Sequence, residues 1–314
     1  MIQCEDGHWA GDYGGPMFLM PGLIFVMYIT KAPFALWKKN AMIMYLKNHQ
    51  QMDGGWGTHI ECASTMFGTV LSYVSLRLLG ESSDEPYLKE ARQFMHTHGG
   101  ALYAPSWAKF WLALLGLYDW SGINPIPVEL WHLPRWFPFH PGRMWCHARM
   151  VYLPMGYIFC KRFTANVSDD VLLQSLRREL YFDVVYESID WDSHRQSCAD
   201  IDNYSPLNPV MRLAQDVLVL YERIIKYLPF IQRLRQKGLQ FTASYMHAED
   251  IQTNYIDIGP VNKAFNMLVA WLESGTIGNN FVHQNLLILY LLGCDNLSEN
   301  FLRHLARIDD YVST

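Results

Sequence analysis

The sequence lacks several features that define common classes of protein. Its six cysteines form no C-x-x-C pair and show no regular spacing, which disfavours a zinc ribbon or a disulfide scaffold and fits a reducing compartment. It has no run of basic residues and a formal net charge of -5, which argues against a nucleic-acid partner. The longest apolar stretch, residues 17–29, is interrupted by Pro21 and Gly22 and is too short to cross a bilayer, and no signal peptide is evident.

Hydrophobic residues, by contrast, make up 50% of the 314 residues, enough to bury a substantial core. The 11 tryptophans and 18 tyrosines are more than an ordinary core requires. Composition leaves two interpretations open: a large aromatic core, or a cavity lined by aromatic rings, whose faces attract positive charge. No linker clearly divides the chain, so we expect a single domain over residues 1–314.

Hydrophobic periodicity predicts a chain that is nearly all helix. Turn clusters at residues 80–86 and 98–100 and a proline-rich stretch at 125–141 separate the helical segments, and no alternating strand pattern with hairpin signals stands out. We therefore predict an all-α fold whose repeated helical hairpins suit an α/α barrel. Apolar residues recur at three- and four-residue spacing in segments 41–47, 64–79, 107–118, 150–163, 169–181, 207–228 and 261–272.

A short pattern, Q-x-x-D-G-x-W, occurs twice, at residues 3–9 and 50–56, 47 residues apart. Such a period indicates a repeated helical unit. The glycine allows a tight turn after a helix, the glutamine can cap nearby helix ends, and the tryptophan can stack on that glutamine and on the neighbouring repeat. The repeat residues are Gln3, Gly7 and Trp9 in the first copy and Gln50, Gly54 and Trp56 in the second.

This pattern resembles the QW repeat of the squalene and oxidosqualene cyclases, which fold a linear polyene into sterol or triterpene rings. The resemblance implies that the repeats are structural staples in an α/α barrel of the terpene cyclase type. It extends in order over almost the whole chain. The segments that carry it are GDYGGPMFLMPG (11–22), GGWGTHIE (54–61), PSWAKFW (105–111), MWCHARMVYLPM (144–155), IGP (258–260) and ARIDDY (306–311).

The resemblance also implies which residues face the substrate. Tyr13 matches a tyrosine that guides the forming B ring in sterol-type enzymes; the less favoured alternative is a turn tyrosine whose hydroxyl bonds to the backbone. Trp107 and Trp145 match cavity tryptophans, for which each cation–π contact contributes roughly 0.5–2 kcal/mol. Tyr152 matches a residue at the constriction of the substrate channel, and Val261 is expected to line the cavity.

His147 is the most discriminating position. It matches the histidine near the final carbocation in sterol-type cyclases, where a near-neutral imidazole can accept the last proton or orient a tyrosine. Pentacyclic triterpene synthases often have an aromatic residue there, so His147 favours a protosterol product, lanosterol or cycloartenol. Without the resemblance, a lone histidine is more often a core residue whose hydrogen bonds are satisfied.

The family's substrate, (3S)-2,3-oxidosqualene, is a long and water-insoluble epoxide. The resemblance therefore implies a monotopic membrane protein on the cytoplasmic face of the endoplasmic reticulum or of lipid droplets, with no cofactor and no metal. The apolar segment 150–163 ends in Lys161 and Arg162, which fits an interfacial anchor. From composition alone a buried helix of the barrel is an equal alternative.

The resemblance covers only the family's amino-terminal portion. The D-C-T-A-E motif that supplies the proton in the carboxy-terminal barrel does not occur, so we expect the isolated chain to be inactive. Residues 282–300 do not look like the family, and our hypothesis is that they and the end of the chain come from retained introns in a gene model. The alternatives are a real insertion and a real truncation.

Three other functional readings compete with the oxidosqualene cyclase. A non-catalytic helical toroid that binds a hydrophobic lipid or a protein partner remains open. The Gly-Asp-Tyr sequence at residues 11–13 and His147 disfavour a bacterial-type squalene cyclase. A prenyltransferase β-subunit shares the toroid, but its zinc ligands have no evident counterpart in this sequence.

Overall fold

The protein is represented by a computed structural model that describes residues 15–32, 35–138, 140–182, 184–225 and 227–273. Over these residues the structure is helical and contains only two isolated β-bridges, so the predicted all-α class is confirmed. The helices are α1 (Leu19–Thr30), α2 (Leu36–Asn48), α3 (Met66–Leu78), α4 (Pro86–Thr97), α5 (Ser106–Leu114), α6 (Cys146–Lys161), α7 (Val171–Tyr181), α8 (Pro209–Ile225), α9 (Pro229–Gln252) and α10 (Pro260–Glu273).

The predicted helical segments correspond to α2, α3, α5, α6, α7, α8 and α10, whereas α1, α4 and α9 were not predicted. Helix α4 begins at Pro86, the last residue of the predicted turn, because proline is well suited to the first position of a helix. Helix α9 also begins at a proline, Pro229, but its apolar residues are scattered around the helix. The proline-rich stretch forms the short 3-10 helices η3 (Val128–His132) and η4 (Pro141–Arg143).

Pro21 and Gly22, which divide the longest apolar stretch of the sequence, both lie within α1. Pro21 is in the first turn, where its missing N–H group would have no partner within the helix. Gly22 lies against Trp111 of α5, and a Cβ atom there would come within 2.9 Å of the indole. Gly22 therefore permits close packing of α1 on α5. Within the described residues, no helix is long and apolar enough to cross a membrane.

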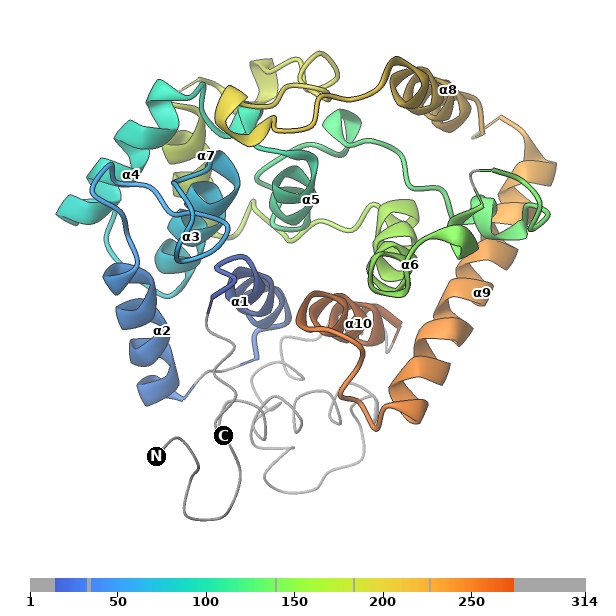
Figure 1. The fold of residues 1–314 in the computed structure, drawn as a ribbon, viewed down its shortest axis with the longest axis horizontal. Coiled ribbons are helices and arrows are strands. Elements are labelled where there is room, and N and C mark those ends of the chain that lie inside the picture. The colour runs from blue at the N-terminus through green and yellow to red at the C-terminus, as the bar shows by residue number, and fades with distance from the viewer. Residues whose placement is uncertain (1–14, 33–34, 139, 183, 226, 274–314) are drawn as a thin grey trace.

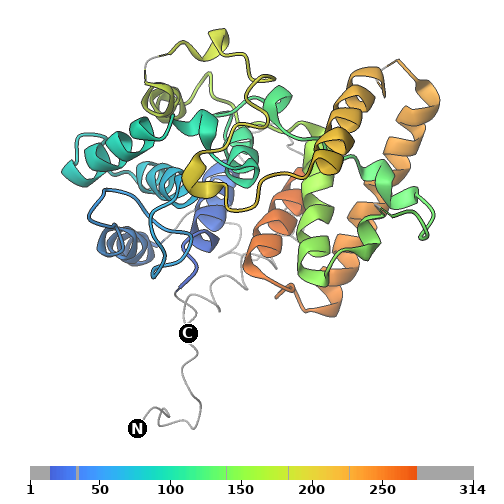
Figure 2. The same cartoon turned by 45° about the horizontal axis from the view of Figure 1, so that its top comes forward.

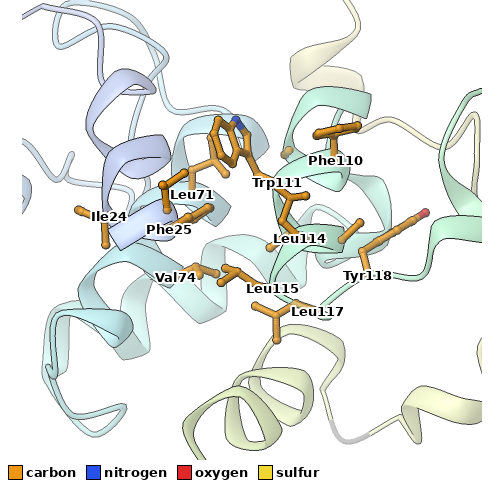
Figure 3. Packing of buried hydrophobic residues seen from close by; sticks show 14 of the residues in the cluster. Ile24, Phe25, Leu71, Val74, Phe110, Trp111, Leu114, Leu115, Leu117 and Tyr118 are labelled. Atoms are coloured by element: carbon orange, nitrogen blue, oxygen red, sulfur yellow. The ribbon is translucent and has the colours of Figure 1, made fainter. Parts of the chain in front are cut away.

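Figure 1 shows α1, α3, α5, α6 and α10 in the middle of the molecule, with α2, α4, α8 and α9 at its periphery. The turned view in Figure 2 agrees and shows α8 and α9 side by side at one end. The apolar core is continuous through the middle helices, and Figure 3 shows side chains of α1, α3 and α5 meeting there. Trp111 links three of these helices, because it meets Phe25 of α1 edge-on at 5.9 Å and stacks on Phe265 of α10 at 4.2 Å.

Helix α6 is buried over most of its length, which decides between the two interpretations of segment 150–163. Met150, Leu153 and Phe159 are each less than a tenth exposed, and the helix packs on α9, α10 and η3. It is therefore a core helix and not an interfacial anchor.

The second copy of the Q-x-x-D-G-x-W pattern connects α2 with α4. Gln50 donates from its amide nitrogen to the carbonyl oxygens of Gly54 at 2.7 Å and of Tyr87, in the first turn of α4, at 2.8 Å. The indole of Trp56 is fully buried and donates to the carbonyl of Leu46, in the last turn of α2, at 2.8 Å. The tryptophan thus satisfies a helix-end carbonyl, while the glutamine joins the α2–α3 loop to α4.

The Asp-Gly pair within the repeat forms the turn that makes these bonds possible. Gly54 has a φ of +83°, and a Cβ atom would approach the backbone of Glu90 to 2.8 Å, so glycine is required there. The Asp53 carboxylate accepts hydrogen bonds from Gly55 N–H at 3.0 Å and from the Ser64 hydroxyl at 2.7 Å. The first copy, with Gln3, Gly7 and Trp9, lies outside the described residues, as does segment 282–300.

Candidate functional site

The described site residues lie on three of the middle helices. Trp107 is in the first turn of α5, Tyr152 is in the middle of α6, and Val261 is in the first turn of α10. Trp145 is the N-cap residue of α6, and His147 is in that helix's first turn. Tyr13 lies outside the described residues, so its role stays a prediction.

The structure brings Trp107 and Tyr152 together across 45 residues of sequence. The Trp107 indole nitrogen donates to the Tyr152 hydroxyl at 3.3 Å, and the two rings meet edge-on with centroids 6.0 Å apart. Both side chains are half-buried. This geometry ties α5 to α6 and fixes an aromatic pair at the edge of the core.

Trp145 and His147 form a second pair at the start of α6. Their rings meet edge-on at 4.6 Å, and the Cys146 sulfur lies 4.0 Å from His147 Nδ1. Trp145 is 71% exposed and His147 is also exposed. A separation of five residues turns Tyr152 about 140° around the helix from His147, which is why Tyr152 faces α5 and His147 faces solvent.

Val261 is only 8% exposed and lies one helical turn before Phe265. Residues four apart share a face of a helix, so Val261 and Phe265 point the same way, and so do Trp107 and Trp111 on α5. The Phe265 and Trp111 rings stack at 4.2 Å with an angle of 9° between them. This stack turns the Val261 face of α10 toward the Trp107 face of α5.

A buried lysine fixes the loop that follows η5 (Tyr186–Ser188) against α5. The Lys109 ammonium donates to the carbonyl oxygens of His194 and Ser197, both at 2.7 Å, and lies 5.6 Å from the centre of the Tyr118 ring. Burial disfavours the charged form and lowers the pKa of Lys109 to about 8. Its partners are backbone groups, so its role is structural. Within the described ranges no cluster of histidine, cysteine or acidic side chains could hold a metal ion.

Sequence reasoning missed two features of this region. The first is the stack of Trp111 on Phe265, for which the only sequence signal is the spacing of four residues from Trp107 and from Val261. The second is a group of buried polar side chains where α9 meets α10, centred on Glu249. No pattern in the sequence distinguishes Glu249 from a surface acid of an amphipathic helix.

These observations define a class: an all-α protein in which aromatic side chains gather where central helices meet, braced by a glutamine–tryptophan staple. The chain belongs to the family of the squalene-hopene cyclase N-terminal domain, whose family model matches residues 1–271. The resemblance inferred from the motifs is thereby confirmed.

Curated proteins with similar sequences are named as synthases of sterols and triterpenes. The chain is 47% identical to the cycloartenol synthase of Dictyostelium discoideum over 291 residues, which are 92% of this chain and 40% of that protein. It is 42% identical to the lanosterol synthase of Mus musculus over 311 residues, covering 99% of this chain and 39% of the relative. It is 39% identical to the alpha-onocerin synthase LCD of Lycopodium clavatum over 319 residues, covering 99% of this chain and 38% of that protein. The chain thus spans about two-fifths of the length of these relatives.

Proposed function

We propose that the chain is the amino-terminal part of an oxidosqualene cyclase that converts (3S)-2,3-oxidosqualene to a protosterol, lanosterol or cycloartenol. The observation that carries this proposal is the similarity over nearly all of the chain to enzymes named lanosterol synthase and cycloartenol synthase. The helices would form one α/α barrel, and the acid that opens the epoxide would come from the D-C-T-A-E motif of a second barrel that this chain does not include.

The chain's own residues would act after the epoxide opens. A cation moving along the folded polyene is stabilised by aromatic faces in a site from which water is excluded. Trp107, braced by Tyr152, and Trp145 would supply such faces, and Val261 would shape the wall. His147 would orient a partner or accept the final proton, because an imidazole can hold a proton near neutral pH. The exposure of Trp145 and His147 in this chain supports a site that a further part of the protein covers.

The test is conversion of oxidosqualene by the full-length protein, with products analysed by gas chromatography and mass spectrometry. We expect a protosterol from the wild type. The His147→Phe variant should shift product toward other cyclised alcohols, and Trp37→Phe, an exposed position on α2, should leave the products unchanged. A folded full-length protein that binds the epoxide without converting it would replace this proposal with the lipid-binding alternative.

We further propose that the protein attaches to one leaflet of a membrane through α8. This helix has an apolar stripe at three- and four-residue spacing that faces solvent, formed by Val210, Leu213, Val217, Leu220 and Ile224, with exposures of 43–65%. An exposed apolar face of this extent is typical of a site that binds a membrane or partner, and a water-insoluble substrate favours the membrane.

Neighbouring residues support this orientation of α8. Tyr227 and Phe230, at the turn into α9, are 71% and 78% exposed and extend the apolar surface. We expect a fluorescent fusion of the full-length protein to label the endoplasmic reticulum or lipid droplets.

Sedimentation with phosphatidylcholine–phosphatidylserine vesicles tests the attachment. The Leu213→Glu and Leu220→Glu double variant should lose most vesicle binding, since each charge opposes burial in lipid. Val171→Glu changes a residue that is 78% exposed on α7, and it should bind like the wild type. Equal binding by all three proteins would refute attachment through α8.

A further inference from the structure

The connection between α9 and α10, residues 253–259, has an unusual backbone. Asn254, Tyr255 and Asp257 have φ values of 53°, 61° and 64°. This left-handed region is rarely occupied by residues other than glycine, and it persists only where the surroundings impose it. The connection leads directly into Val261, which makes its position relevant to the candidate site.

Backbone N–H groups of this connection are bonded inward to side chains or to α9. The Tyr255 N–H donates to the carbonyl of Asp250 at 2.7 Å, and the Asp257 N–H donates to the Thr253 hydroxyl at 3.0 Å. The Gly259 N–H donates to the Asn262 side-chain oxygen at 3.0 Å. These bonds hold the left-handed residues in place.

Glu249, in the last turns of α9, is at the centre of the arrangement and is only 7% exposed. Its Oε1 accepts from the Ile258 N–H at 3.2 Å and from Asn262 Nδ2 at 3.1 Å. Its Oε2 accepts from Asn262 Nδ2 at 3.1 Å and from Asn266 Nδ2 at 3.2 Å. One carboxylate therefore joins the connection and the first two turns of α10.

Two faces of α10 are thus fixed by different means. Asn262 and Asn266, four residues apart, face the Glu249 carboxylate. Val261 and Phe265, also four apart, turn toward α5, where Phe265 stacks on Trp111. A shift of Ile258 and Asn262 would therefore move Val261 relative to Trp107.

We propose that Glu249 is a positioning residue for the candidate site: its buried carboxylate fixes the segment Ile258–Val261, and thereby the wall that shapes the folding polyene. This role rests on the proposed cyclase function. Glu249 does not contact the substrate in this account. It acts through the segment that it holds.

The test uses the full-length protein and two measurements, hydrogen–deuterium exchange and the ratio of cyclised products from oxidosqualene. The Glu249→Leu variant keeps a similar side-chain volume and removes both acceptors. We expect the Ile258 amide to exchange about three- to tenfold faster, as the loss of one hydrogen bond predicts, and the product ratio to change. Fragmentation that separates Ile258 from Gly259 provides the resolution.

Two further variants test whether an effect of Glu249→Leu reflects a general loss of folding. Glu249→Gln keeps one side-chain oxygen, which can still accept from the Ile258 N–H. This variant should therefore show smaller changes in exchange and products. Asn262→Ala leaves Glu249 bonded to Ile258 and should free Gly259 instead.

The matched control is Glu273→Gln. The Glu273 carboxylate also joins α10 to α9, through His247 Nε2 at 2.6 Å, but it makes no bond to residues 254–261 in the described structure. It should leave both exchange of Ile258 and the product ratio unchanged.

The outcomes separate the claims. Faster Ile258 exchange with an altered product ratio in Glu249→Leu, and neither in Glu273→Gln, supports the proposal. Unchanged exchange, or faster exchange with unaltered products, overturns it, because Glu249 would then be idle or merely structural. A folded wild type that forms no cyclised product contradicts the proposed function, and it overturns this role as well. The exchange data would then report only on how the segment is held.

Discussion

Replacing Trp56 by phenylalanine tests whether the repeat stabilises the fold as its hydrogen bonds indicate. The indole is fully buried and donates to the Leu46 carbonyl at 2.8 Å. That carbonyl also accepts from the His49 N–H at 3.2 Å, so the lost bond should cost about 1 kcal/mol or less. The smaller ring leaves a void on the order of 40 Å³, which costs about 1 kcal/mol beyond the lost transfer free energy of the removed atoms.

We therefore expect Trp56→Phe to lower the free energy of unfolding by about 2–3 kcal/mol. Urea denaturation followed by far-UV circular dichroism measures it. Trp37→Phe, at a residue of α2 that is 60% exposed, is the matched control and should change stability by less than about 0.5 kcal/mol. A loss below about 1 kcal/mol, or one equal to the control, would refute the role of the repeat as a staple.

Three further predictions concern stability. Gly54→Ala should lower the free energy of unfolding by more than about 1 kcal/mol, because φ is +83° and the new Cβ would lie 2.8 Å from the Glu90 backbone. Gly259→Ala, where the new Cβ would meet open space, should not have this effect, and thermal melts of the two variants test the difference. Glu222→Gln removes the negative charge shared by Arg162 and Arg235, and it should lower the free energy of unfolding by roughly 2–4 kcal/mol. Amide hydrogen exchange in α8 should become faster, and unchanged exchange would contradict this prediction. Burial and the nearby charge of Asp250 raise the pKa of Asp257 to about 8, so the folded state retains a proton that the unfolded chain releases near pH 4. This contribution to stability should be lost as pH rises from about 4 to 8. The urea denaturation midpoint should therefore fall with pH more steeply in the wild type than in Asp257→Asn, and equal slopes in the two proteins would refute the prediction.

The local sequence was sufficient to predict those helices whose burial follows from the spacing of their own apolar residues. Three- and four-residue periodicity located α7, which buries one apolar face against the core, and also α3 and α10, which are buried on nearly every side. It failed for α9, because glycine and polar residues take four of its buried positions, Gly238, Thr242, Glu249 and Asp250, beside only Leu239 and Met246. It also did not predict α1, whose Pro21 lies in the first turn, where a proline is tolerated.

Some features of the candidate site were likewise predicted from the sequence, whereas others were determined only by the fold. The sequence alone identified the repeat at residues 50–56, the motifs around Trp107 and His147, and through them the family. Only the tertiary structure decided that Trp107 donates to Tyr152, that Gln50 reaches Tyr87, and that Glu249 holds the entry to α10. These contacts join residues whose separation in sequence carries no periodic signal. They form because packing brings whole helices together, and the partner of a buried polar group is set by which helix lies next to it.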